Sequence, residues 1–127
     1  MNVFLHHIYE YEKGIRKLVL HTLHKKHEEF VINRLKSCDI PYIIQYLDND
    51  RFNVFFGNEL CIATLERIGN KPLNRFSPEE DFILGIMLGY DRLIQCERYL
   101  KTSNKKEKQN ESFDKLRINN RKYAVNG

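Results

Sequence analysis

A strong helix start followed at once by an apolar segment is the feature that most constrains what this chain can fold into. Ser77 can accept a hydrogen bond from the open amides of a first helical turn, Pro78 suits the first helical position, and the three acidic residues that follow complement the positive end of a helix. Residues 82–90 are then apolar, and charged residues return from Asp91 onward. We therefore predict one long C-terminal helix over about 78–100, whose first half is covered on every side.

The apolar half of this helix implies an assembly. In a chain of 127 residues a small sheet covers only one flank of it, so a second helix or a second copy of the protein must cover the other. Gly85 and Gly89 lie four residues apart on one helical face and would let another backbone approach closely. A homodimer is therefore predicted, and the candidates for dimer or close-packing contacts are Phe82, Ile83, Gly85, Ile86, Met87 and Gly89.

The charge of the chain is divided unevenly along its length. Residues 1–100 hold 13 Lys and Arg against 14 Asp and Glu, a net charge of −1, whereas residues 101–127 hold 8 against 3, a net charge of +5. The basic segment has no apolar period that could pack. We predict a single domain over residues 1–101 and a basic, largely disordered tail over residues 102–127.

Several classes of protein are disfavoured by the sequence. No segment approaches the roughly 18 to 20 apolar residues of a membrane-spanning helix, and the N-terminus lacks the pattern of a secretory signal, so a cytoplasmic protein is expected. The three cysteines are widely spaced and odd in number, which indicates free thiols. Glycine-rich phosphate or dinucleotide loops and nucleophile elbows are missing, so no cofactor is predicted and an enzyme is disfavoured.

Apolar spacing predicts the remaining elements. Helices are expected over about 2–12, 26–38 and 58–68, and a β-hairpin over 42–47 and 51–56. The hairpin pattern places Ile44, Tyr46, Phe52, Val54 and Phe56 on one buried face and turns Gln45, Arg51 and Asn53 toward water or a neighbour. Residues 15–23 fit either a helix or a half-buried strand, with periodicity slightly favouring the helix.

Histidines supply the candidate sites. His21, His24 and His27 recur at a spacing that would align metal ligands on a helix, with Glu28 as a fourth ligand, but the alignment fails if a strand ends near Leu23. The candidates for a ligand-binding cluster are His6, His7, Tyr9 and His21. Adjacent His6 and His7 lie about 100° apart on a helix, so one is expected to pack and the other to face solvent or a partner.

Several stretches resemble a known family: 6–14, 18–23, 53–57, 78–85, 89–91 and 95–96. Together they are similar to the small bacterial family catalogued as domain of unknown function twenty twenty-three, and the resemblance spans about residues 3–100. It implies a compact α+β homodimer with three strands, about five helices and no established activity. It also favours a strand over about 17–23, which makes the predicted sheet 17–23, 42–47 and 51–56.

The family resemblance further implies a gene neighbour that encodes a flavodoxin, an acidic electron carrier toward which a basic tail would be steered. The function predicted first is a non-enzymatic interaction or accessory protein, homodimeric and cytoplasmic. The alternatives are a redox accessory or binding partner of a flavodoxin, and a metal- or small-ligand-binding protein that uses the histidines. RNA binding on a sheet face with Arg51, Asn53 and Phe55 is disfavoured, because the body of the protein is slightly acidic.

Overall fold

The computed structural model describes the backbone of residues 1–109 and the side chains of residues 1–104. Short 3₁₀ turns at Lys25–His27 and Leu73–Arg75 accompany the main elements. In chain order these are α1 (Asn2–Glu12), β1 (Leu18–His24), α2 (Glu28–Ser37), β2 (Tyr42–Tyr46), β3 (Arg51–Gly57), α3 (Glu59–Ile68), α4 (Pro78–Met87) and α5 (Arg92–Gln109). The predicted α+β class, with three strands and five helices, is confirmed.

The three strands form one antiparallel sheet in the order β1-β3-β2. β3 is therefore central and pairs with both neighbours, so that Asn53 lies opposite Thr22 on one side and Gln45 on the other. The segment that was ambiguous between helix and strand is β1. β1 pairs with β3 along its whole length, and these backbone hydrogen bonds stabilise the strand over the alternative helix.

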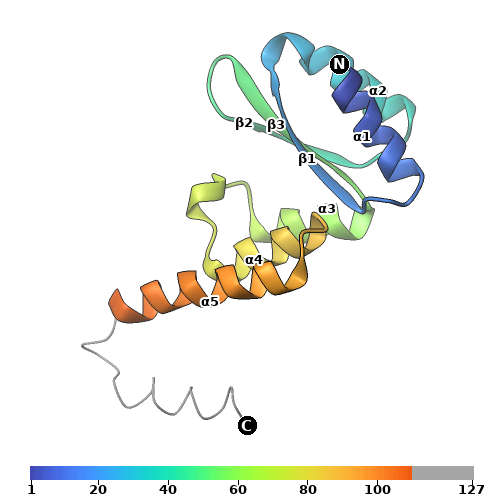
Figure 1. Cartoon of the computed structure of the whole chain (residues 1–127). Coiled ribbons are helices and arrows are strands. Elements are labelled where there is room, and N and C mark those ends of the chain that lie inside the picture. The colour runs from blue at the N-terminus through green and yellow to red at the C-terminus, as the bar shows by residue number, and fades with distance from the viewer. Residues whose placement is uncertain (110–127) are drawn as a thin grey trace.

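The sheet is covered on both sides (Figure 1), with α1 and α2 on one side and α3, α4 and α5 on the other. Because successive strand residues point to opposite faces, β3 contributes to two cores. The first core, under α1 and α2, contains Phe4, Ile8, Val19, Leu23, Val31, Leu35, Ile40, Phe52, Val54 and Phe56. The second core contains Leu18, Phe55, Ile62, Leu65, Leu84 and Leu88.

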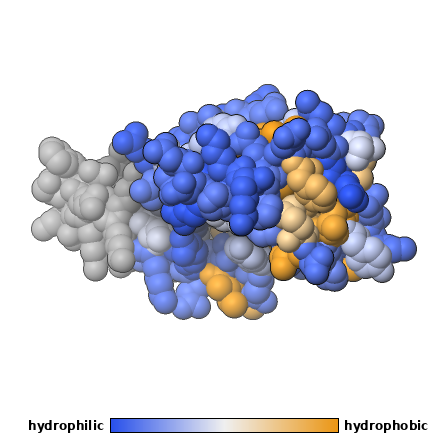
Figure 2. Space-filling model, turned by 90° about the horizontal axis from the view of Figure 1, so that it is seen from above, coloured by the Kyte–Doolittle hydropathy of each residue, from blue (hydrophilic) through white to orange (hydrophobic). Residues whose placement is uncertain are grey.

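The surface around α1 and α2 is largely polar. Seen from above, the side of Figure 1 on which these helices lie, hydrophilic residues cover most of the molecule and apolar residues gather in limited patches (Figure 2). The buried residues of α1, Phe4 and Ile8, and of α2, Val31 and Leu35, all belong to the first core. Both helices are thus ordinary amphipathic elements that turn one stripe toward the sheet.

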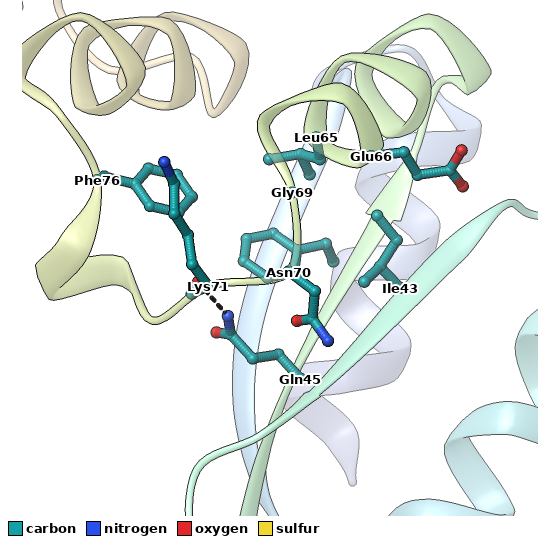
Figure 3. A pocket seen from close by; sticks show the side chains of 9 residues that line it. Ile43, Gln45, Leu65, Glu66, Gly69, Asn70, Lys71 and Phe76 are labelled. Carbon is teal, nitrogen blue, oxygen red and sulfur yellow. Dashed lines mark hydrogen bonds between the residues drawn. The ribbon is translucent and has the colours of Figure 1, made fainter.

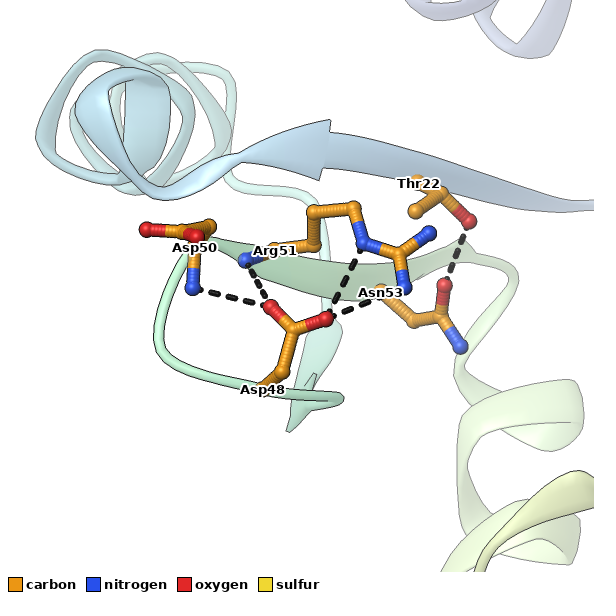
Figure 4. Close-up of polar contacts among 5 residues, drawn as sticks. All are labelled: Thr22, Asp48, Asp50, Arg51 and Asn53. Atoms are coloured by element: carbon orange, nitrogen blue, oxygen red, sulfur yellow. Dashed lines mark hydrogen bonds and ion pairs between the residues drawn. The ribbon is translucent and has the colours of Figure 1, made fainter.

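A single carboxylate organises the turn between β2 and β3 (Figure 4). Asp48 Oδ1 accepts hydrogen bonds from the backbone amides of Asp50 and Arg51, each at 2.8 Å, and Asp48 Oδ2 accepts from the Arg51 guanidinium at 3.0 and 3.1 Å. The backbone hydrogen bond from Asp50, followed by the side-chain bond from Arg51, lowers the pKa of Asp48. The turn is therefore fixed by an ionised Asp48.

The predicted helix over 78–100 is divided into α4 and α5, which corrects its extent. α4 starts with the predicted Ser77 cap, a capping box in which Ser77 and Glu80 bond to each other's backbone amides. It ends because Gly89 takes a φ of 83°, with Tyr90 N donating to Gly85 O at 3.1 Å. Asp91 Oδ1 then accepts from Ile94 N and starts α5.

α5 continues as a helix to Gln109, so the domain boundary predicted at residue 101 falls within it. Most of the predicted disordered tail, residues 110–127, lies outside the described residues, and its disorder stays a prediction.

Candidate functional site

The predicted histidine cluster lies where α1 packs beside β1. The rings of His7 and His21 meet edge to face, with their centroids 5.2 Å apart. His7 Nδ1 lies 3.1 Å from Glu10 Oε1, and Arg16 Nε donates to Glu10 Oε2 at 3.2 Å. The His7 side chain is 19% exposed and that of His6 68%, so in the single chain His7 packs and His6 lies on the surface, where solvent or a partner was expected.

Glu10 is held as a carboxylate at the centre of these contacts. The hydrogen bond with His7 is the main cause that lowers the pKa of Glu10, and Arg16 lowers it further, whereas desolvation acts in the opposite direction. A general base needs a pKa near the working pH, and the lowered pKa of Glu10 moves away from it. Each oxygen of the Glu10 carboxylate makes one of these contacts, and the backbone carbonyl of Glu10 accepts from Ile15 N at 2.9 Å. The arrangement therefore ties the end of α1 to the segment that enters β1.

The four ligand-binding candidates form two pairs, which meet at Glu10 Oε1: His7 Nδ1 lies 3.1 Å from this oxygen and His6 Nε2 lies 3.8 Å from it. His6 stacks on Tyr9 with centroids 6.1 Å apart, and the ammonium of Lys13 lies 5.6 Å from the centroid of the Tyr9 ring. This pair is exposed on α1, whereas His7 and His21 meet at the half-buried contact with the sheet. No single set of four converging side chains results, and ligand binding by this cluster stays a prediction.

His21 should make the stability of the protein depend on pH. Burial is the main cause that lowers its pKa, and the neighbouring His7 and the amino terminus act in the same direction. Its Nδ1 atom is buried and has no hydrogen-bond partner among the described residues. In the window below the ordinary value of 6.5, the unfolded chain therefore binds more protons than the folded one. The free energy of unfolding should therefore decrease as the pH falls below 6.5.

Replacing His21 with phenylalanine or glutamine should flatten this dependence, because neither side chain titrates. Thermal unfolding followed by circular dichroism between about pH 7.5 and about pH 5 measures the effect. The melting temperature of the wild type should fall more across this range than that of either variant. Variants that retain the full wild-type slope would show that another group is responsible. The His21→Gln variant separates loss of titration from loss of polarity.

The structure does not bring together His21, His24 and His27, the residues of the predicted metal site. Because β1 extends to His24, alternation turns His21 and His24 to opposite faces of the sheet, whereas the prediction required one helical face. His24 Nδ1 accepts a hydrogen bond from Lys26 N at 3.0 Å and so caps the following turn. Among residues whose side chains are described, no three of His, Cys, Asp or Glu are placed to hold a metal ion.

The close approach predicted at Gly85 is made within the chain. Gly85 is buried, and a Cβ atom there would collide with the side chain of Gln95 on α5. The rings of Phe82 and Tyr99 pack beside this contact, with centroids 5.8 Å apart. Gly89 has a different role, since it forms the turn that ends α4.

The other close-packing candidates are only partly covered. Ile86 and Met87 are half-buried, Met87 packs against the second core, and Ile83 is exposed. α5 thus covers much of the flank of α4 for which a second helix or a second copy was expected. The predicted dimer contact through these residues stays a prediction.

α5 has an unusual orientation. It turns the amide of Gln95 and the ring of Tyr99 toward α4. Its most apolar side chains lie in water instead: Leu93 is 79% exposed, Ile94 62% and Leu100 54%. We call these three side chains the outward face of α5. An amphipathic helix of a monomer normally buries such residues, so this face is a candidate interaction site.

A row of polar side chains crosses the sheet, and the sequence predictions missed it (Figures 3 and 4). Thr22 Oγ1 donates to Asn53 Oδ1 at 2.6 Å, as Figure 4 shows, and Gln45 Nε2 donates to Lys71 O at 2.8 Å, as Figure 3 shows. Between them, Asn53 Nδ2 donates to Gln45 Oε1 at 3.1 Å. Gln45 and Asn53, which were expected to face water or a neighbour, are 9% and 3% exposed. A sequence signal existed, because Asn53 and Gln45 are polar residues that face each other across the predicted hairpin.

Comparison with known proteins places the chain in a family. Residues 2–102 match the family model described as protein of unknown function, DUF2023, which confirms the resemblance found in the sequence. A comparison with curated proteins gives no match. None of the described helices is long and apolar enough to cross a membrane. Since the match covers most of the 127 residues, the chain belongs to the DUF2023 family.

Proposed function

We propose that this protein is a non-enzymatic interaction protein that works as a homodimer, held together through the outward face of α5. One observation carries the proposal: α5 packs a mixed polar side against α4 and leaves its most apolar side chains in water. Contiguous apolar groups on a surface mark interaction sites, because burying them in a partner is favourable by roughly 25 cal/mol per Å².

The outward face is a stripe interrupted by charged residues. At roughly 100° per residue, Leu93 and Leu100 lie within about 40° of the direction opposite Gln95, Ile94 lies about 80° from that direction on the other side, and Glu97 and Lys101 lie between them. The seven-residue interval between Leu93 and Leu100 is that of helices which pack along each other. α5 has 18 residues, a length of about 27 Å, which is long enough for an extended helix–helix contact.

Charge favours a second copy as the occupant. Residues 1–100 hold 13 Lys and Arg against 14 Asp and Glu, so two copies of the body repel each other little. Between the residues of the outward face, Glu97 and Lys101 form an ion pair at 2.8 Å within the same helix. A strongly charged partner would find little unbalanced charge there, whereas a second apolar stripe of the same kind fits the face.

Replacing Leu93 with glutamate should dissociate the dimer. The change places a charge at the centre of a desolvated contact while leaving the monomer fold alone, since Leu93 is exposed in the single chain. We expect the dissociation constant to rise at least about 100-fold, as for an interface hot spot. Sedimentation velocity measures the mass, which for the wild type should be twice the 15.3 kDa of the chain.

Ile15→Glu is the matched control, because Ile15 is similarly exposed but lies in the segment between α1 and β1. This variant should remain dimeric. A wild-type chain that is still monomeric at about 100 µM would refute the proposal, because that affinity is too weak for a stable dimer. A Leu93→Glu chain that dimerises like the wild type would show that the dimer interface is not the outward face of α5.

Two earlier expectations remain predictions. Binding of a flavodoxin rests on the family resemblance and on the net charge of +5 over residues 101–127, many of whose side chains lie outside the described part. A cytoplasmic location likewise rests on the sequence. The histidine cluster does not favour an enzymatic function, because the contacts with His7 and Arg16 lower the pKa of Glu10, away from that of a general base at neutral pH.

A further inference from the structure

We propose that a cavity between the sheet and the segment after α3 binds a small neutral amide with an aromatic or aliphatic body, and that Gln45 recognises its amide group. This site is independent of the outward face of α5. It lies on the side of the sheet opposite the histidine cluster.

The cavity measures about 240 Å³ and has mostly apolar walls (Figure 3). β2 and β3 supply one wall and the end of α3 another, and the segment leading to α4 supplies the rest. The lining residues are Ile43, Gln45, Phe55, Leu65, Glu66, Gly69, Asn70, Lys71 and Phe76. Pockets for drug-sized molecules are about 300–1,000 Å³, so this one suits a smaller molecule with a flat or compact apolar body.

Lys71 anchors the segment that closes the cavity to two different elements. Gln45 Nε2 donates to the backbone carbonyl of Lys71 at 2.8 Å, which fastens the segment to the sheet. The ammonium of Lys71 pairs with Glu80 at 2.6 Å, which fastens it to the first turn of α4. Lys71 also lies 5.9 Å from the centroid of the Phe76 ring. The walls are thus held in place without a ligand, as is usual for preformed sites.

The polar row fixes how Gln45 presents its amide. Lys71 O can only accept, so it must face Gln45 Nε2 rather than Oε1. Gln45 Oε1 then faces Asn53 Nδ2, and Asn53 Oδ1 faces the Thr22 hydroxyl, which donates. An acceptor at one end therefore determines the order of donors and acceptors through the whole row. This leaves no ambiguity about which atom of Gln45 is nitrogen.

Gln45 keeps hydrogen-bonding capacity for a ligand. A primary amide has two N–H groups and two carbonyl lone pairs. Among the described residues, one N–H of Gln45 donates to Lys71 O, and one lone pair of Gln45 Oε1 accepts from Asn53 Nδ2. A buried amide with one free donor and one free acceptor at an apolar wall matches a ligand that carries both, such as another amide.

The charges around the cavity favour a neutral ligand. The ammonium of Lys71 is engaged by Glu80, so an anion would find little free positive charge. The remaining charged lining residue, Glu66, is exposed to water, where an ion pair with a cation would contribute little. A charged molecule would lose its hydration without a buried partner, which a neutral amide avoids.

Benzamide is the probe that tests this inference, with methyl benzoate as an analogue that accepts but cannot donate. Both are titrated into the full chain labelled with ¹⁵N, and two-dimensional NMR follows the backbone amides of Gly69 and Lys71 and the side-chain amide of Gln45. Benzamide should shift these signals saturably. Gln45→Met should weaken benzamide at least about 10-fold and change methyl benzoate by less than about 3-fold, because only benzamide uses the amide donor and acceptor together.

Asn70→Trp tests whether benzamide binds in this cavity, and it leaves the polar row unchanged. It therefore tests the proposed site even if Gln45→Met fails to fold. Asn70 is an exposed residue of the lining, and an indole there should fill the mouth and abolish the shifts. Asn74→Trp, at an exposed position of the same segment outside the lining, should bind benzamide like the wild type. Three results would overturn the proposal: no saturable shifts, unchanged binding in Asn70→Trp, or equal benzamide affinity in Gln45→Met.

Discussion

Replacing Gly57 with alanine should destabilise the fold by about 2–6 kcal/mol, a large part of the roughly 5–15 kcal/mol that holds such a domain together. Two costs add. Gly57 has a φ of 151°, a conformation that costs a residue with a side chain about 1–3 kcal/mol. The new Cβ would also collide with the carbonyl oxygen of Lys17 and lie 2.9 Å from Leu18 Cα, an overpacking cost of about 1–3 kcal/mol.

The backbone around Gly57 cannot easily move to relieve the collision. Lys17 O accepts from Asn58 N at 2.8 Å, and Gly57 N donates to Pro41 O at 3.2 Å. Shifting either strand would break these bonds at the end of β3, the strand that pairs with both others. Urea unfolding followed by circular dichroism, at one protomer concentration because dimerisation contributes to stability, measures the loss.

Gly14→Ala is the control for this change. Gly14 also has a positive φ, 78°, but a Cβ there would meet nothing within 4 Å. Its cost should be confined to the backbone conformation, about 1–2 kcal/mol. If the two variants lose equal stability, the collision with Lys17 contributes nothing and the account of Gly57 is wrong.

Replacing Phe56 with alanine should cost about 3–5 kcal/mol, because the side chain is fully buried at the centre of the first core. The rings of Phe56 and Phe4 meet edge to face with centroids 5.8 Å apart, so the change also removes the contact that joins β3 to α1. Urea unfolding should show a lower midpoint with an unchanged slope if the variant still unfolds in one step.

Phe30→Ala is the matched control, because Phe30 also packs against Phe4, with centroids 6.4 Å apart, but is an exposed residue of α2. Its loss should cost less than about 1.5 kcal/mol, since truncation there leaves no closed cavity. Equal losses in the two variants would contradict the assignment of Phe56 to the centre of the core.

Elements with purely local signals could be predicted from the sequence. Asn58 caps α3 through its side chain, Ser77 caps α4, and alternation defined the hairpin of β2 and β3. The division of the last helix was harder to foresee. An apolar pattern that runs through Gly89 looks the same whether the helix continues or turns, and a positive φ at one glycine decides between them.

The burial of Gln45 and Asn53 depended on information that a hairpin pattern does not contain. Alternation separates the two faces of a sheet but does not reveal that a second layer covers both. The second layer here includes α3 and the segment through Lys71, whose carbonyl completes the polar row. The orientation of the histidines depended on equally non-local information. β1 must pair with β3 before the directions of His21 and His24 are defined, and their partners Val54 and Arg51 lie 33 and 27 residues later.

The polar row also has a consequence for how the strands find their alignment. A slip of two residues between β2 and β3 would keep every apolar side chain on its own face, so hydrophobic burial alone tolerates it. Such a slip would bring Asn53 opposite Ile43 or Leu47 in place of Gln45 and leave the buried Nδ2 group of Asn53 without its acceptor, at a cost of about 1–3 kcal/mol. Three polar side chains in register thus exclude misaligned sheets that the two cores would otherwise accept.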